Sequence, residues 1–314
     1  MLSAVGTAPQ LSDVPVPTPG HGELLIKVGA CGLNFADLLT IDGTYQDMPP
    51  LPAALGKEYA GLVTAVGPGT SVPIGTRVAV FTGHGGLAEY AVAPEARCLA
   101  IPDSMPFDVA AGFQIAYGTS HLALTRTARL QADETLLVLG AAGGVGLTAV
   151  EIGASLGATV IAVARGSDRL AVAKDAGATH LIDGRDEGLR DAVKALGGAD
   201  VVYDAVGGDA FRDALRATNP EGRILAIGFA SGDVPQIKAN HLLVKNVSVH
   251  GFYWGGFLEF APDVLTDSLR TLVEWFEDGR IRPHISHTFP LDQAMEALDL
   301  LRSRRATGKI AVTP

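Results

Sequence analysis

Cysteine is scarce in this chain, because Cys31 and Cys98 are the only two among 314 residues. Two cysteines make neither a disulfide framework nor a thiolate zinc site. Positive charge is also scarce, with 24 lysine and arginine residues against 34 aspartate and glutamate residues, a net charge of −10 at pH 7. Phosphate neutralisation needs clustered lysine and arginine, so nucleic acid is not expected as a partner.

Long apolar runs are missing as well, and no segment is long enough to span a bilayer. The first ten residues lack the basic region and apolar stretch of a secretion signal. We therefore expect no membrane partner and a cytoplasmic location. The composition that remains is that of a core-forming chain, 47% hydrophobic and 18% charged, with a length that suits two domains.

The most informative segment is residues 135–146, where an apolar strand leads into a glycine-rich turn and then a helix of small residues. Such a turn needs glycine for positive φ, for close approach of the backbone to a pyrophosphate and for packing of the helix on the strand. Unpaired N–H groups at the start of that helix then hold the diphosphate. The predicted cofactor-binding residues here are Ala141, Ala142, Gly143, Gly144, Val145 and Gly146.

Strands and helices alternate after this turn. Helices are expected at residues 147–156, 168–176, 189–196 and 210–218, and strands at 159–164, 180–183, 199–206 and 223–228. This alternation predicts an α/β fold with a doubly wound, parallel Rossmann sheet that binds its ligand at the carboxyl ends of the strands.

The end of the second strand indicates which dinucleotide binds. An NAD site usually has an acidic residue there, about 20 residues beyond the glycines, but this chain has Arg165, Ser167 and Arg169 around that point. Guanidinium groups and a hydroxyl suit a 2′-phosphate, so NADPH is the predicted cofactor. The alternative is that these arginines are solvated charges at the start of a helix.

Residues 1–110 have a different pattern, with short strand candidates separated by proline and glycine turns, as in a small folded barrel. The strands are expected at residues 24–28, 61–66, 77–81 and 88–92. Near the C-terminus we expect a sheet-edge strand at 246–252, helices at 264–278 and 291–303, and a last strand at 308–312 that rejoins the first domain's sheet.

Several segments together resemble the medium-chain dehydrogenase/reductase superfamily, and within it the zinc-free quinone oxidoreductase group. They are residues 15–23, 32–37, 56–67, 114–119, 141–146 and 222–228. The resemblance implies a GroES-like catalytic domain at residues 1–110 and 255–314, a Rossmann NADP(H)-binding domain at 111–254, and a homodimer formed through the sheet edge. The opening strand usual in this group is short or missing here, which we interpret as a truncated start.

The resemblance also bears on zinc. Alcohol dehydrogenases of this superfamily have a metal-binding cysteine where this chain has Asn34, and a histidine where it has Lys57. An amide and an ammonium do not replace a thiolate and an imidazole, so no metal site is predicted. Without a Lewis acid, alcohol oxidation is disfavoured. We expect zinc-independent transfer of hydride from NADPH to a small-molecule acceptor, a quinone or a related α,β-unsaturated carbonyl.

By the same resemblance, Asn34 and Thr119 lie near the nicotinamide and its ribose, and Gly228 and Phe229 lie near the carboxamide. Asn34 is also the predicted catalytic residue; the alternative is a turn residue bonded to its own backbone. The residues predicted to line the substrate pocket are Tyr45, His84, Phe252, Tyr253 and Trp254. His84 is otherwise a solvated loop histidine, and the three aromatic residues are otherwise interface core.

Tyr45 leads to a second hypothesis. In related enoyl thioester reductases, a tyrosine at a similar place is the proposed proton donor to the carbon beside the carbonyl. Tyr45 would then be the catalytic acid of an enoyl-CoA reductase, unless its ring merely packs before the proline-rich segment 49–52. A third hypothesis is a protein that binds NADPH with little turnover, as do some lens proteins that resemble this family.

Overall fold

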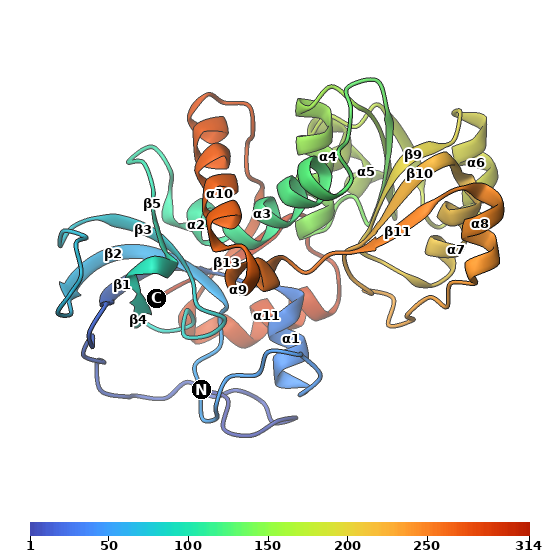
Figure 1. Cartoon of the computed structure of the whole chain (residues 1–314). Coiled ribbons are helices and arrows are strands. Elements are labelled where there is room, and N and C mark those ends of the chain that lie inside the picture. Colours follow the sequence, from blue (N-terminus) through green and yellow to red (C-terminus); the bar gives the residue numbers. More distant parts are fainter. The chain divides into compact units, whose positions relative to one another are not determined.

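The computed structural model describes residues 1–314, which form two compact units. Unit 1 contains residues 1–115 and 283–314, and unit 2 contains residues 116–282. Both units carry an extended sheet (Figure 1). The architecture confirms the predicted α/β class with a Rossmann-type sheet and a separate β-rich domain.

Unit 1 is built on a seven-stranded sheet with the order β12-β13-β1-β2-β3-β5, in which β4 also pairs with β1. Its strands are β1 (Glu23–Gly32), β2 (Glu58–Val66), β3 (Arg77–Phe81), β4 (Tyr90–Pro94), β5 (Cys98–Ala100), β12 (Ile285–Pro290) and β13 (Lys309–Thr313). Its helices are α1 (Phe35–Ile41), α2 (Phe107–Ala111) and α11 (Ala294–Arg302), with 3₁₀ segments η1 (Glu95–Arg97) and η4 (Leu291–Gln293).

The last strand rejoins the sheet of unit 1, as expected from the sequence. Strand β13 pairs antiparallel with β1, with Cys31 opposite Val312, and lies beside it in Figure 1. Strand β1 supplies much of the core, because Leu24, Ile26 and Val28 alternate along it on the buried face. This pairing places the end of the chain beside the residues that follow β1.

Unit 2 contains a six-stranded parallel sheet with the order β11-β10-β9-β6-β7-β8. Its strands are β6 (Thr135–Leu139), β7 (Thr159–Ala164), β8 (His180–Asp183), β9 (Ala199–Asp204), β10 (Thr218–Ala226) and β11 (Ser248–Gly251). Numbered from β6, this is the order 3-2-1-4-5-6 of a dinucleotide-binding sheet. The order reverses between β6 and β9, where such sheets bind their ligand.

Helix α7 shows how a helix packs on the sheet of unit 2 through an apolar face. Its residues Phe211, Ala214 and Leu215 are buried in the core against the sheet. The helices are α3 (Gln114–Leu122), α4 (Gly144–Ser155), α5 (Ser167–Asp175), α6 (Leu189–Ala195), α7 (Gly208–Ala217), α8 (Ala239–Lys245), α9 (Phe257–Phe260) and α10 (Pro262–Glu277), with a π-helical segment η2 (Ala123–Thr127) and a 3₁₀ segment η3 (Trp254–Gly256).

Residues 255–282, expected in the GroES-like domain, lie in unit 2. The reason is the packing of α10 on α3: His121 Nδ1 lies 2.7 Å from Ser268 Oγ, and the His121 ring meets the Trp275 ring edge-on at 5.3 Å. Burial also lowers the pKa of His121 to about 4, so the imidazole is neutral near pH 7. An amphipathic helix pattern shows that a helix has a buried face but does not show which surface it covers.

None of the helices combines the length and the hydrophobicity that crossing a bilayer requires.

Candidate functional site

The glycine-rich turn connects β6 to α4 at the point where the strand order reverses. Gly140 has a φ of +73°, a conformation that favours glycine. A Cβ on Gly146 would lie 2.1 Å from the Gly140 carbonyl oxygen, so the first turn of α4 approaches β6 closely only without a side chain there. The Ala141 N–H donates a 3.0 Å hydrogen bond to the Val163 carbonyl, which ties the turn to β7. This geometry fits a bound pyrophosphate at the N-terminus of α4.

The second predicted cofactor segment lies at the end of β7. Gly166 there has a φ of +91°, Arg165 and Ser167 on either side are exposed, and Arg169 lies one turn into α5. The Gly166 N–H donates to Asp183 Oδ1 at 3.2 Å. An acidic residue therefore lies beside this turn after all, on the neighbouring strand β8.

Arg185 engages that acidic residue. Its Nε donates to Asp183 Oδ1 at 3.0 Å, and its Nη2 forms an ion pair with Oδ2. These bonds hold the pKa of the Asp183 carboxyl well below its usual range. The sequence analysis missed Arg185, because the residue reaches the turn only through the pairing of β8 with β7. The Asp183 carboxylate is thus already paired with a guanidinium, and contact of Arg165 and Arg169 with a 2′-phosphate stays a prediction.

In unit 1, Asn34 lies between the end of β1 and the start of α1. Its Nδ2 donates to Glu58 Oε1 at 3.0 Å and to the Gly32 carbonyl at 3.3 Å, and its Oδ1 accepts from Lys309 Nζ at 2.7 Å. Its backbone N–H donates to Asp37 Oδ2 at 2.8 Å. The amide is thus held by two charged side chains, Glu58 and Lys309.

Lys309 and Glu58 form a buried ion pair behind Asn34. The Lys309 ammonium uses all three of its protons, on the Leu33 carbonyl at 2.7 Å, Asn34 Oδ1 at 2.7 Å and Glu58 Oε1 at 2.8 Å. The other carboxylate oxygen, Glu58 Oε2, accepts the Ile115 N–H at 2.9 Å. The side chains of Lys309 and Glu58 are 6% and 0% exposed, so both charges depend on these partners.

Tyr45 lies against another charged side chain, Lys57. The Lys57 ammonium is 4.0 Å from the centroid of the Tyr45 ring and donates to the Gly83 carbonyl at 3.2 Å. Partial desolvation of the His84 ring and the Lys57 charge both lower the pKa of His84, the residue after Gly83. Tyr45 and His84 of the predicted pocket thus both interact with Lys57. Their contact with a substrate stays a prediction.

Thr119, the predicted ribose contact, is a buried residue of α3 in unit 2. The next residue fixes the position of this helix, because Ser120 Oγ lies 2.9 Å from Tyr203 Oη and 2.8 Å from Thr148 Oγ1. Gly118 precedes Thr119, and a Cβ added to it would lie 2.4 Å from the Trp254 side chain. Helix α3 is therefore pinned to β9 and α4, and Trp254 packs directly against it.

The remaining predicted residues also lie in unit 2. Gly228 follows β10, where its N–H donates to the Asp204 carbonyl at 3.3 Å, and Phe229 beside it is 42% exposed. Phe252 follows β11 and packs against Phe257 at 5.6 Å between ring centroids, while Tyr253 is 44% exposed. The aromatic cluster thus has a packed part and an accessible part.

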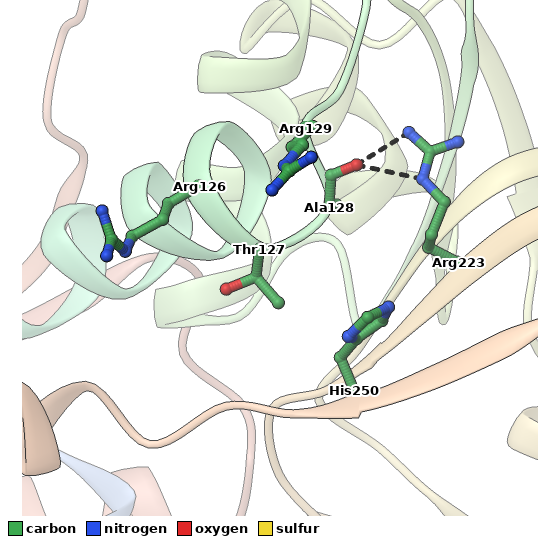
Figure 2. Close-up of a pocket in the computed structure, with 6 residues that line it drawn as sticks. All are labelled: Arg126, Thr127, Ala128, Arg129, Arg223 and His250. Carbon is green, nitrogen blue, oxygen red and sulfur yellow. Dashed lines mark hydrogen bonds between the residues drawn. The ribbon is translucent and has the colours of Figure 1, made fainter.

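An arginine-rich recess of about 370 Å³ lies elsewhere on unit 2. It is lined by Arg126, Thr127, Ala128, Arg129, Arg223 and His250 (Figure 2). Arg223 donates to the Ala128 carbonyl, as the dashed lines show, and also pairs with Glu134. The recess contains none of the predicted site residues, and Arg223 anchors the loop before β6 to β10.

The structure contains no group of three or more histidine, cysteine, aspartate or glutamate side chains arranged to hold a metal ion. At the two positions that bear on zinc, the Asn34 amide bonds Glu58 and Lys309, and the Lys57 ammonium bonds Gly83. Glu58, Lys309 and Arg185 were not predicted from the sequence, although they contact or adjoin the candidate site residues.

Known proteins are similar to this chain in sequence and in fold. Residues 20–103 match the alcohol dehydrogenase GroES-like domain family, and residues 144–275 match the zinc-binding dehydrogenase family. A quinone oxidoreductase-like protein 2 homolog of Nematostella vectensis is 41% identical over 93% of this chain and 82% of that protein.

Two solved structures are similar over almost their whole length. One is the quinone oxidoreductase of Thermus thermophilus, also solved in complex with NADPH, with a TM-score of 0.88, 30% identity, and coverage of 100% of this chain and 98% of that chain. The other is the Escherichia coli quinone oxidoreductase complexed with NADPH, with a TM-score of 0.89, 28% identity, and coverage of 96% and 95%.

The fold and the site define an oxidoreductase with a dinucleotide-binding sheet and a GroES-like domain. The chain belongs to the medium-chain dehydrogenase/reductase superfamily, in its quinone oxidoreductase group, as the sequence predicted.

Replacing Lys309 tests the buried ion pair. Lys309→Met leaves the Glu58 carboxylate buried without its counter-ion, so we expect the free energy of unfolding to fall by about 3–5 kcal/mol in urea titrations. The matched control is Arg302→Met, which removes an exposed pair with Asp42 at 3.2 Å and should cost at most about 1 kcal/mol. Equal losses in the two variants would show that the buried pair contributes no more than a surface pair.

Replacing Gly146 tests the cofactor cradle. In Gly146→Ala the added Cβ would meet the Gly140 carbonyl oxygen at 2.1 Å, so the start of α4 must move away from the turn. We expect NADPH affinity, measured by fluorescence titration, to weaken by about 10-fold or more. Gly251→Ala is the control, because a Cβ there meets nothing within 4 Å. Unchanged NADPH affinity in Gly146→Ala would place the pyrophosphate elsewhere.

Proposed function

We propose that this chain is a zinc-independent, NADPH-dependent reductase that transfers hydride to quinones or related α,β-unsaturated carbonyls. Two structural neighbours are quinone oxidoreductases solved with NADPH, which supports both the cofactor and the acceptor class. The observation that carries the zinc-independent part is the Asn34–Glu58–Lys309 network, because it occupies the asparagine with charged partners.

Most of the proposed contacts of the cofactor are residues of unit 2. The start of α4 packs closely on the turn from Gly140 because Gly146 has no side chain, and the N–H groups there are the proposed pyrophosphate donors. Arg165, Ser167 and Arg169 are the proposed donors for the 2′-phosphate. Thr119, Gly228 and Phe229 are the proposed contacts on the nicotinamide half. When bound, NADPH supplies the hydride, and the protein's task is to orient the acceptor and exclude competing reactions.

Charge in unit 1 supports reduction without a metal. A carbonyl acceptor gains negative charge as hydride arrives, and positive groups fixed near the site stabilise that charge. Asn34 is held by the Lys309 ammonium at 2.7 Å, and Lys57 lies beside Tyr45. We propose that unit 1 is the catalytic domain, with Asn34 positioning the nicotinamide ribose and Tyr45 and His84 lining the acceptor pocket together with Phe252, Tyr253 and Trp254.

A second candidate activity is favoured by one observation. Lys57 faces the Tyr45 ring at 4.0 Å, an arrangement that eases release of the phenol proton. Tyr45 would then act as the proton donor in reduction of an enoyl thioester, where the α-carbon must be protonated.

Assembly and location are proposals as well. Strand β11 pairs on one side only, with β10, which leaves its other edge available for a second copy of the chain. We propose a homodimer joined along this edge and a cytoplasmic enzyme. Sedimentation would distinguish a dimer from a monomer.

Turnover of NADPH tests the proposed function. After dialysis against a chelator, we expect the protein to oxidise NADPH with an ortho- or para-quinone at an undiminished rate, and added zinc should not raise it. An unsaturated acyl thioester measured in parallel tests the second activity. Slow turnover with every acceptor would favour a protein that only binds NADPH, and a rate that zinc restores would contradict the metal-free proposal.

Cofactor preference tests the arginine assignment. In Arg165→Ala/Arg169→Ala, loss of charge-assisted bonds to the 2′-phosphate should lower the ratio of kcat/KM for NADPH to that for NADH by about 10- to 100-fold. Lys174→Ala removes an exposed charge on the same helix and should leave the ratio unchanged. Equal ratios in the double variant and the wild type would mean that other groups hold the phosphate.

A further inference from the structure

Lys57 is an unusual lysine because its side chain is almost completely buried, with 2% of the residue exposed. It directly precedes β2, and its ammonium has two neighbours within contact distance: the Gly83 carbonyl at 3.2 Å and the face of the Tyr45 ring at 4.0 Å. Burying an ammonium is costly unless it is paired. The site therefore maintains a positive charge against one face of a half-buried phenol.

Several titratable groups face this pair. Asp37 of α1, Asp47 of the segment before β2 and His84 of the turn after β3 all interact electrostatically with Lys57. Burial lowers the pKa of Lys57, and the two carboxylates act in the opposite direction and favour its charged form. Desolvation and the Lys57 charge both lower the pKa of His84. This histidine therefore loses its proton at a lower pH than an ordinary imidazole and is already neutral at alkaline pH.

We propose that Lys57 is a positioning residue for Tyr45: its ammonium fixes the ring and stabilises the phenolate that remains after Tyr45 has given up its proton. The proposal rests on the proposed function and narrows its acceptor class. A cation against the face of an aromatic ring is attracted by the ring's electron density, and that attraction increases when the ring carries a negative charge.

The proposed reaction has two steps, hydride addition and protonation. Addition of hydride from NADPH to the β-carbon of an α,β-unsaturated carbonyl forms a C–H bond, oxidises the cofactor to NADP⁺ and leaves an enolate. The Tyr45 O–H bond then breaks, its proton forms the new bond to the α-carbon, and the electron pair stays on the phenolate oxygen beside Lys57. Water returns a proton to the phenolate before the next turnover.

This step separates two acceptor classes. An enolate needs a proton placed at carbon, so a positioned phenol with a stabilising cation accelerates the reaction. A quinone receives its proton on oxygen, which water supplies readily. The Lys57–Tyr45 pair should therefore accelerate the reduction of enones and enoyl thioesters more than the reduction of quinones.

A double-mutant cycle tests the pairing. Rates with a cyclic enone and with a quinone are measured for Lys57→Met, Tyr45→Phe and the combined variant, with Lys27→Met, an exposed lysine of β1, as the matched control. Methionine keeps the length and apolar stem of lysine. We expect enone kcat/KM to fall by about 10² or more in Tyr45→Phe and by about 10-fold in Lys57→Met, with no further loss in the combined variant. Lys27→Met should leave both rates within about 3-fold of the wild type, and the ratio of enone kcat/KM to quinone kcat/KM should fall in Tyr45→Phe and in Lys57→Met.

The pH profile separates positioning from simple packing. Loss of Lys57 should move the alkaline limb of the enone profile to higher pH by about one unit, and Lys57→Arg, which keeps the charge, should restore the wild-type profile. Additive losses in the cycle, equal losses with both acceptors, or an unmoved alkaline limb would each overturn the proposal.

A readout without turnover keeps the inference distinct from the proposed function. The ultraviolet absorbance of tyrosinate, measured as the difference between wild type and Tyr45→Phe, should develop at lower pH than the same difference measured in the Lys57→Met background. If no acceptor oxidises NADPH but this shift is present, the proposed function fails and the Lys57–Tyr45 coupling stands. If turnover is normal and the shift is absent, the coupling fails and the reductase stands.

Discussion

The buried ion pair between Lys309 and Glu58 is the constraint on which the candidate site of unit 1 depends. It joins the end of the chain to β2 across β1, the strand between them. All three ammonium protons are used, and one of them fixes the Asn34 amide at 2.7 Å. Two charges buried at this depth require these partners. The position of Asn34 therefore depends on the pairing of β13 and β2 with the two sides of β1.

At the two positions that bear on zinc, this chain has an amide, Asn34, and an ammonium, Lys57. Asn34 is held by an ammonium, and Lys57 lies over a phenol. A metal concentrates positive charge in one ion, whereas this chain distributes it between two lysines whose partners are carboxylates, carbonyl groups and an aromatic face. Such an arrangement can stabilise developing negative charge but supplies no open coordination position. This charge distribution is the basis for our proposal of hydride addition without a metal.

The sequence predicted unit 2 well, because its signals are local. The strand that begins at Thr159 and the strand at 180–183 have the predicted bounds, and α4 begins three residues before its expected start, within the glycine turn. Contacts between distant segments could not be predicted. Lys309 and Glu58, which form the buried ion pair, are 251 positions apart in the sequence. Arg185 reaches the cofactor segment only through the pairing of β8 with β7. Helix α10 packs on α3 in unit 2, whereas the sequence predicted it in the other domain. Neither periodicity nor a motif records such pairings.

The most direct test of this account is to follow the atoms added to the acceptor. A cyclic enone would be reduced by chelator-treated protein with NADPH deuterated at the transferable C4 position, and separately with unlabelled NADPH in heavy water, and the products examined by NMR. The account predicts deuterium at the β-carbon in the first product and at the α-carbon in the second, as direct hydride transfer followed by protonation requires. A first product without deuterium at the β-carbon, or a reaction that stops when metal is removed, would contradict it.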